Sequence, residues 1–276
     1  MEKTNHIDLA RLQRPNLPSD LILRPTLLAY LNENIHKSLT MVCAGAGFGK
    51  STLISSWLQN LEYYSAWISI QVADSDLRLF LSHLIATIQA KVPGFGNAIQ
   101  PLLQTVPLPP VEYLAIELKN ELAQLPTPFV LVLDDLHLVD HSSVFPLLQV
   151  LLEPPLDPLH LCILSRKELP LPLSRLRSKN RLNEISTHQL RMTHEEIKGF
   201  LGNSMNDADC SWVQERAEGW VAGLRLFKLQ SSLNQHLRLF KKEEESNIFD
   251  SFFTEEILDG FNASCLNALF KISILT

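Results

Sequence analysis

The sequence predicts an α/β protein in which a parallel five-stranded sheet, with helices on both faces, is followed by a smaller all-helical domain. Short apolar runs of strand length alternate with segments of helical period as far as residue 186. This alternation is typical of a parallel sheet that is covered on both faces. After residue 186 the strand-like runs stop and only helix-like segments follow. The runs predicted to be strands are Leu39–Cys43, Ala66–Ile70, Phe129–Leu133, Leu159–Leu164 and the weaker Leu182–Ser186.

Helical periodicity fills the segments between the predicted strands. A helical pattern begins at Pro25, and a second helix is expected at Thr52–Leu61, directly after the first strand. Apolar residues repeat with helical spacing between Leu77 and Ile88, which predicts a third helix. Residues 93–110 are rich in Pro and Gly, so we expect them to form a loop that joins two helices.

The boundary between the sheet domain and the helical domain is predicted near residue 190. Thr193 and Glu196 form a capping-box pattern just beyond it, which marks the start of a helix. Residues 1–20 are polar and contain two prolines, so they are expected to form an N-terminal arm. Further helix-like segments lie at 212–217, 222–229, 249–258 and 266–275, and the charged stretch 241–246 is expected to be an exposed loop.

Composition excludes several classes of function. With 276 residues, of which 46% are hydrophobic and 20% charged, the chain has the composition of an ordinary globular protein. Its net charge of −6 provides no general field for nucleic acid, and we interpret the basic cluster Arg175–Lys179 as a solvated helix end. Four widely separated cysteines suggest neither a zinc ribbon nor a disulfide framework. No leader-like or bilayer-length apolar stretch is present, so we expect a cytoplasmic location and no membrane contact.

The segment Ala44–Thr52 lies between a predicted strand and a predicted helix, and its sequence matches a phosphate-binding P-loop. Gly47 and Gly49 allow the backbone to turn its N–H groups toward phosphate oxygens at a helix N-terminus. In a bound ATP or ADP, Lys50 is predicted to reach the β-phosphate and, in ATP, the γ-phosphate, and the Ser51 hydroxyl is predicted to ligate Mg²⁺. The predicted nucleotide contacts in this loop are Gly45, Ala46, Gly47, Phe48, Gly49, Lys50, Ser51 and Thr52.

Ala44 occupies the position of the first glycine of the usual motif. That position shapes the turn and does not contact phosphate, so we still expect nucleotide binding. The competing interpretation is a glycine-rich turn between strand and helix that contains an incidental lysine.

Two carboxylates follow the apolar strand Phe129–Leu133, which is the pattern of a buried parallel strand that delivers acids to the carboxyl edge of a sheet. We predict that Asp134 ligates Mg²⁺, through water, and that Asp135 positions or deprotonates the attacking water. The alternative is that the pair caps the following turn. Arg166 follows the next strand and could sense the γ-phosphate, the alternative being an exposed arginine. The strand Ala66–Ile70, inserted between the P-loop and the acids, is similar to that of ATPases with an added strand between these two motifs.

Several sequence blocks, in the correct order, resemble the STAND class of signal-transducing ATPases, and specifically the MalT type of large LuxR-like transcriptional regulators. They cover nearly all of the chain beyond residue 20. The blocks are Leu23–Leu28, the P-loop Cys43–Leu53, Ala66–Ser69, Asp74–Asp76, Arg78–Leu81, Leu133–Leu138, Ser165–Lys167, Leu171–Arg177 and Glu218–Leu224.

The resemblance implies a nucleotide switch in which ADP holds a resting monomer, while inducer and ATP favour a self-associating form. It places Arg24 near the nucleotide. It also implies that Gly219–Val221 corresponds to a Gly-x-Pro turn that approaches the adenine in related proteins. The proline is absent here, so the base contact is left open, and Trp220 is equally well interpreted as a core residue.

The resemblance also supplies the expected domain order. It consists of an arm at 1–20, a nucleotide-binding domain at 21–190, a helical lid at 191–262 and the start of a truncated winged-helix domain at 263–276.

These observations predict the ATP/ADP-binding switch module of a signal-responsive transcriptional regulator, with slow Mg-dependent hydrolysis that resets the switch. The alternative is a stand-alone P-loop ATPase or phosphotransferase that acts on a separate substrate. A third possibility is a binding module that has lost hydrolysis, against which the presence of Lys50, Ser51, Asp134 and Asp135 argues. We expect no duplex-DNA binding by this chain alone.

Overall fold

The computed structural model describes residues 9–125, 128–140, 143–154, 156, 159–202 and 207–233. They fall into two compact units. The first, here called the sheet unit, contains the residues up to Gly45 together with Lys50–Leu190. The second, here called the helical unit, contains the residues from Arg191 onward together with the P-loop tip Ala46–Gly49.

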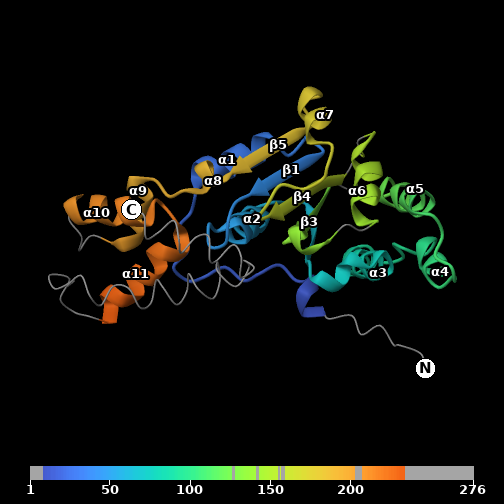
Figure 1. Cartoon of the computed structure of the whole chain (residues 1–276), viewed down its shortest axis with the longest axis horizontal. Helices are drawn as coiled ribbons and strands as arrows, with labels where there is room; N and C mark the ends of the chain where they lie inside the picture. The colour runs from blue at the N-terminus through green and yellow to red at the C-terminus, as the bar shows by residue number, and fades with distance from the viewer. Residues whose placement is uncertain are drawn as a thin grey trace, which may run out of the picture. The chain divides into compact units, whose positions relative to one another are not determined.

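The sheet unit is built on five parallel strands in the order β2-β3-β4-β1-β5 (Figure 1). The predicted fold class is therefore confirmed. Each predicted strand is present, and the first and last have the predicted bounds. The strands are β1 (Leu39–Cys43), β2 (Tyr64–Ser69), β3 (Phe129–Asp134), β4 (Leu159–Ser165) and β5 (Leu182–Ser186).

The strand order decides which loops meet. The last residue of β1, Cys43, pairs with Ser165 of β4, and Ser69 at the end of β2 pairs with Asp134 at the end of β3. Because all strands are parallel, their carboxyl ends lie along one edge of the sheet. The chain segment after β1 and the acids after β3 therefore meet at this edge, with only β4 between their strands.

Helices cover both faces of the sheet. Alternate strand residues such as Leu39, Leu131 and Leu161 share one apolar cluster with residues of α3, α5 and α6. On the opposite face, Trp57 of α2 contacts His160 of β4 edge to face, with ring centroids 5.8 Å apart. The helices and 3₁₀ turns are η1 (Leu9–Leu12), α1 (Pro25–Glu33), α2 (Lys50–Gln59), η2 (Val72–Ser75), α3 (Leu77–Gln89), α4 (Ile99–Leu103), α5 (Val111–Leu122), η3 (Leu136–Leu138), α6 (Val144–Leu152), α7 (Leu173–Ser178) and α8 (Thr187–Leu190).

One helix lies where the sequence predicted only a loop. The stretch 93–110 contains α4, because Ile99 and Leu103 are one helical turn apart and both are buried. The carboxylate of Glu121 accepts hydrogen bonds from the backbone N–H groups of Gly96 and Ala98, which fixes the chain just before this helix. Proline and glycine content indicated the turns at either end but not the buried apolar pair between them.

The N-terminal segment is fastened to the sheet unit. The Arg11 guanidinium donates hydrogen bonds to the Ser69 carbonyl, from Nε at 3.1 Å and from Nη2 at 3.0 Å, and it pairs with Asp74. Asp74 is fully buried and lies 2.7 Å from Nδ1 of His83. The Ser55 hydroxyl donates to the carbonyl of Pro15 at 2.7 Å. Residues 9–15 are therefore part of the fold of this unit.

In its described part, the helical unit contains α9 (His194–Leu201), α10 (Asp207–Ala217) and α11 (Val221–Leu233). The predicted capping box is confirmed, since Thr193 Oγ1 accepts from the N–H of Glu196, and the Glu196 carboxylate accepts from the N–H of Thr193. The segments predicted at 241–246, 249–258 and 266–275 lie outside the described residues. The expected four-part division of the chain stays a prediction.

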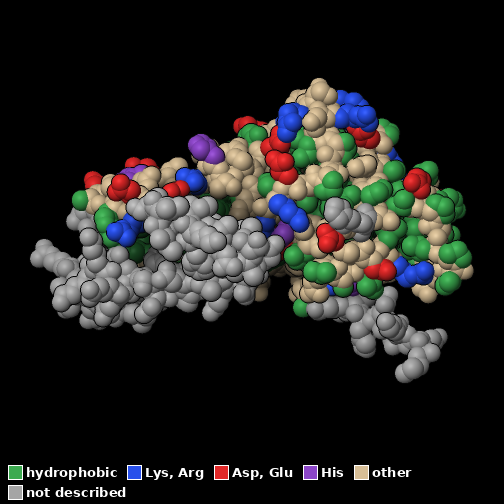
Figure 2. All heavy atoms as spheres, in the orientation of Figure 1, with side chains coloured by type: hydrophobic (Ala, Val, Ile, Leu, Met, Phe, Trp, Pro, Cys, Tyr) green, Lys and Arg blue, Asp and Glu red, His purple; other side chains and the backbone are tan. Residues whose placement is uncertain are grey.

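The basic cluster 175–179 lies on and after α7, where it forms ion pairs with acidic neighbours. Arg175 pairs with Glu153, and Arg177 pairs with Glu184. Figure 2 shows the blue and red side chains mixed together in this region. These ion pairs are exposed to solvent, which agrees with the interpretation of the cluster as a solvated helix end. Among the described residues, no helix has the length and apolar character needed to cross a bilayer.

Candidate nucleotide-binding site

The P-loop follows β1 directly and leads into α2, so its position is set by the central part of the sheet. The N–H of Ala44 donates to the carbonyl of Ser165, which ties the start of the loop to the end of β4. Gly47 and Gly49 have φ angles of 73° and 79°, a left-handed conformation that favours glycine. The loop ends at the N-terminus of α2, where the unpaired N–H groups and the helix dipole attract an anion. Gly45, Ala46 and Phe48 are partly buried in the loop, and Ser51 and Thr52 lie in the first turn of α2.

Lys50 is held by the loop that precedes it. Its Nζ donates two hydrogen bonds, to the carbonyls of Ala44 and Gly45, each at 2.9 Å. The side chain is only 6% exposed, and this burial lowers the pKa of the ammonium, while the nearby carboxylate of Asp135 opposes the shift. An ammonium group has three N–H donors, so one remains for a ligand oxygen. Lys50 thus has an N–H donor that could bind a phosphate oxygen.

Asp134 is buried at the end of β3, beside the start of α2. A hydrogen bond joins it to Ser51. Burial, and after it the neighbouring carboxylate of Asp135, raises the pKa of Asp134 to about 6, so the side chain is ionised at neutral pH. Its Oδ1 has no hydrogen-bond partner among the described residues. A buried, ionised oxygen without a partner is costly unless a cation compensates it.

Ser51 and Asp134 therefore fit a Mg²⁺ ion. Both offer oxygen atoms, the donor type that Mg²⁺ prefers, and Oδ1 of Asp134 lacks a partner among the residues that the structure describes. The described residues contain no cluster of three or more His, Cys, Asp or Glu that could hold a metal by itself. Mg²⁺ is usually held by one or two protein groups together with waters and substrate phosphates.

Asp135 differs from Asp134 in backbone and surroundings. Its φ of 58° is left-handed, which is uncommon for a non-glycine residue and is found at functional sites. Its side chain is 37% exposed, and its Oδ1 lies 3.9 Å from Nε of Arg166 and 3.7 Å from Nδ1 of His137. The structure thus brings Asp135 and Arg166 together at the carboxyl edge, from β3 and β4.

His137 was not predicted as a site residue. Besides its proximity to Asp135, its Nδ1 accepts a hydrogen bond of 3.4 Å from the N–H of Arg166. Burial lowers the pKa of His137, which favours the neutral imidazole. The signal for it was its position, three residues after Asp134 beyond the same strand.

Arg24 lies at the N-terminus of α1. Its guanidinium donates to the carbonyls of Leu190, at 2.9 Å, and Gln189, at 3.2 Å, at the C-terminal end of α8. The arginine thus contacts the last residues of the sheet unit. Its place near the nucleotide stays a prediction.

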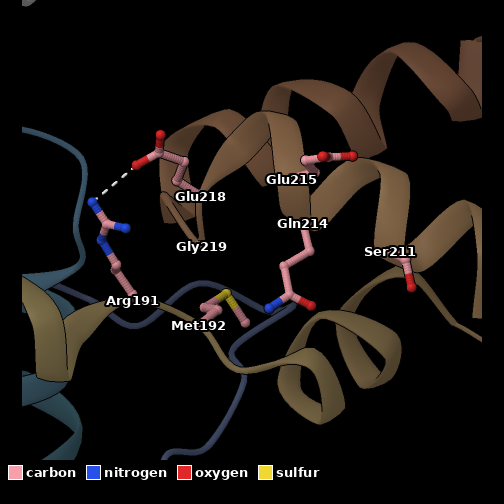
Figure 3. Close-up of a pocket in the computed structure, with 7 residues that line it drawn as sticks. All are labelled: Arg191, Met192, Ser211, Gln214, Glu215, Glu218 and Gly219. Carbon is pink, nitrogen blue, oxygen red and sulfur yellow. Dashed lines mark ion pairs between the residues drawn. The ribbon is translucent and has the colours of Figure 1, made fainter.

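The helical unit has a pocket of its own, of about 450 Å³. Figure 3 shows Arg191 facing Glu218 at one end of it, and the two form an ion pair of 2.9 Å. The backbone of Gly219 lines the pocket beside Met192. Gly219 is also the first residue of the turn Gly219–Val221. The expected approach of the adenine base to this turn remains a prediction.

Comparison with known proteins gives two kinds of likeness, and no family model matches the chain. The chain is 30% identical over 275 residues to the HTH-type transcriptional regulator MalT of Serratia proteamaculans. It is equally similar to the MalT regulator of Klebsiella pneumoniae. Both alignments cover 96% of this chain and 30% of the relative, so the chain spans less than a third of the length of these curated relatives.

Solved structures show the same fold. The Walker-type ATPase of Pyrococcus abyssi matches with a TM-score of 0.52 and 15% identity, over 81% of this chain and 71% of that one. A STAND protein with a tetratricopeptide-repeat sensor from Pyrococcus horikoshii matches with a TM-score of 0.52 and 14% identity, over 81% of this chain and 34% of that one. The predicted resemblance is therefore confirmed: along nearly its whole length the chain is similar to part of the MalT-type regulators, and its fold is that of a P-loop ATPase.

Proposed function

We propose that this chain is the ATP/ADP-binding switch module of a signal-responsive transcriptional regulator, in which slow hydrolysis of ATP resets the switch. The proposal rests above all on the buried Asp134 carboxylate, which lies beside Ser51 at the end of the P-loop and has one oxygen without a partner in the described part of the chain. The likeness to MalT regulators supports a regulatory role for this site.

Each residue has a role that follows from its surroundings. Lys50, already fixed by two loop carbonyls, directs its free N–H toward the β- and γ-phosphates. Ser51 and Asp134 would hold Mg²⁺, which neutralises charge on the phosphate oxygens when bound. Asp135 is exposed enough to orient or deprotonate a water molecule, and Arg166 beside it contributes positive charge for the γ-phosphate.

The remaining features of the switch belong to the same proposal. ADP holds a resting monomer, and ATP together with an inducer favours self-association. Arg24 contributes to the nucleotide site, and the protein acts in the cytoplasm. The chain alone does not bind duplex DNA specifically, because its net charge is −6 and its densest basic cluster, 175–179, is engaged in ion pairs.

Nucleotide analysis tests the proposal directly. The purified protein is denatured with acid, and any released nucleotide is identified by chromatography. Nucleotide-free protein is then titrated with ADP and ATP, with and without Mg²⁺, and hydrolysis is followed in a single turnover. Variants of charged residues in the site are compared with Lys91→Ala, which removes an exposed lysine of the sheet unit and so controls for changes in surface charge. We expect adenine nucleotide binding that Mg²⁺ strengthens, and slow hydrolysis. Absence of binding to both nucleotides in the folded protein would refute the proposal.

The alternative of a stand-alone ATPase or phosphotransferase makes a different prediction. Such an enzyme turns over many times and is strongly stimulated by a separate substrate, whereas a switch hydrolyses ATP slowly. Multiple-turnover rates measured with candidate acceptor molecules separate the two functions.

A further inference from the structure

The turn between α10 and α11 has a backbone that few sequences can adopt. Glu218 and Gly219 have consecutive left-handed φ angles of 46° and 73°. A side chain at Gly219 would place its Cβ 2.7 Å from the backbone nitrogen of Met192, so this position requires glycine. The turn is fixed by two hydrogen bonds, from the N–H of Met192 to the Gly219 carbonyl at 2.9 Å and from the N–H of Trp220 to the Ala217 carbonyl at 2.7 Å.

This rigid turn presents Trp220 and the start of α11 to the P-loop tip, within the helical unit. The indole Nε1–H of Trp220 donates to the carbonyl of Ala46 at 2.8 Å. The N–H of Ala222 donates to the carbonyl of Gly47 at 3.0 Å. Ala222 lies in the first turn of α11, where N–H groups have no partner within the helix. The P-loop carbonyl therefore caps this helix.

The contact leaves no room for a side chain at Gly47. A Cβ there would lie 2.6 Å from Nε1 of Trp220 and 2.6 Å from Cβ of Ala222. Gly47 is thus required for two independent reasons, its left-handed φ of 73° and the close approach of α11. The contact between α11 and the P-loop tip therefore requires glycine at both Gly47 and Gly219, and few other sequences could form it.

Peptide geometry connects these hydrogen bonds to phosphate binding. In a trans peptide the C=O and the following N–H point in opposite directions. Binding the Ala46 carbonyl therefore orients the N–H of Gly47, and binding the Gly47 carbonyl orients the N–H of Phe48. Both N–H groups belong to the loop predicted to surround the phosphates. Trp220 and the first turn of α11 thus hold the two carbonyls, and the two N–H groups point away from α11.

We propose that Trp220, together with the Gly47-capped N-terminus of α11, is a positioning element that couples phosphate binding at the P-loop to the helical unit. The inference rests on the proposed nucleotide-binding function. Phosphate that binds the N–H groups of Gly47 and Phe48 polarises the same peptide units and strengthens their carbonyls as acceptors. Because linkage is reciprocal, α11 then favours bound phosphate to the same degree that phosphate favours the capped α11.

The test replaces Trp220 with Phe, which retains an aromatic ring but removes the N–H donor. Trp212→Phe is the matched control, since Trp212 packs against Phe227 and Arg216 within the helical unit. Affinities for ADP, inorganic pyrophosphate and adenosine are measured by calorimetry. Loss of one neutral hydrogen bond predicts roughly 3- to 10-fold weaker binding of ADP and pyrophosphate by Trp220→Phe. Adenosine binding is expected to change little in either variant.

A second measurement uses the wild-type protein and so does not depend on the folding of any variant. Hydrogen exchange of the Ala222 amide is followed with and without saturating pyrophosphate, and we expect pyrophosphate to slow it. Because any bound ligand stabilises the whole fold, the Ala222 amide is compared with amides of α10, and a greater slowing at Ala222 is the result expected from coupling.

The outcomes separate the two proposals. If the wild-type protein binds neither ADP nor pyrophosphate, the nucleotide-binding function is wrong and the inference falls with it. If the wild-type protein binds both ligands, two results would each show that the coupling is wrong while the function stands. One is that Trp220→Phe binds the ligands as tightly as Trp212→Phe does. The other is that pyrophosphate does not slow hydrogen exchange of the Ala222 amide more than that of the α10 amides.

Discussion

Acid should destabilise the sheet unit through one buried histidine. His160 of β4 is 4% exposed, and its Nδ1–H donates to the carbonyl of Lys37 at 2.7 Å. Its Nε2 accepts from the hydroxyl of Thr40 at 2.9 Å, and that hydroxyl in turn accepts from the amide of Asn183 at 3.3 Å. In the neutral imidazole both ring nitrogens thus have a hydrogen-bond partner. Burial lowers the pKa of His160 from 6.5 to about 4.

The size of the effect follows from linkage. Between pH 6.5 and about 4 the unfolded chain binds a proton at His160 that the folded protein does not, so the free energy of unfolding falls as the pH falls. At about 1.4 kcal/mol for each pKa unit, the full effect is about 3 kcal/mol, of which about 2 kcal/mol is lost between pH 7 and pH 5.

Urea denaturation of the wild type and of His160→Gln, at pH 7, 6 and 5, measures this loss. Glutamine keeps an amide donor and an acceptor but does not titrate, so the carboxylates affect both proteins equally. We expect the wild type to lose about 2 kcal/mol more than the variant between pH 7 and pH 5. Parallel stability curves would show that His160 is not the group responsible.

Two further predictions concern the nucleotide site. Lys50→Ala should weaken ATP binding by roughly 10- to 100-fold, because charge-assisted hydrogen bonds to phosphate are lost, and it should leave adenosine binding nearly unchanged. Calorimetry with both ligands checks this, and an equal loss for both would indicate misfolding instead. Asp135→Asn should retain ATP binding and slow hydrolysis, whereas Asp134→Asn should also weaken Mg²⁺-dependent binding. Mg²⁺ titrations and single-turnover rates compare the two variants, and identical behaviour would contradict the separate roles.

The sheet could be predicted because its strands are apolar runs with clear ends. Leu39–Cys43 and Leu182–Ser186 have the predicted bounds, since continuous burial leaves a simple pattern in the sequence. The strand order could not be predicted, because it depends on which helices pack together over long distances in the chain. Helix α4 was missed for a similar reason, because Ile99 and Leu103 are buried in an apolar cluster whose other members lie on distant elements of the sheet unit.

The candidate site was predictable where its residues are consecutive. The P-loop and the acid pair at Asp134 are local patterns, each attached to one strand end. The proximity of His137 and Arg166 to Asp135 depends on the neighbouring position of β3 and β4, which the sequence does not state. Trp220 was interpreted as either a base contact or a core residue, and the hydrogen bond from its indole to a P-loop carbonyl 174 positions away was not predicted.

The fastening of the N-terminal segment has a practical consequence for where this chain can be shortened. From the sequence we expected the first 20 residues to form only an arm, since they are polar and contain two prolines. Asp74, however, is fully buried, and despite that burial its pKa is lowered by hydrogen bonds from His83 and the backbone of Gln71 and by the charge of Arg11. A chain that begins after Arg11 would remove one of the three groups that stabilise this carboxylate, and would leave it to His83 and the backbone of Gln71. It would also leave the carbonyl of Ser69, the residue paired with Asp134, without the guanidinium that binds it. Tags or cleavage sites placed ahead of residue 9 avoid this loss.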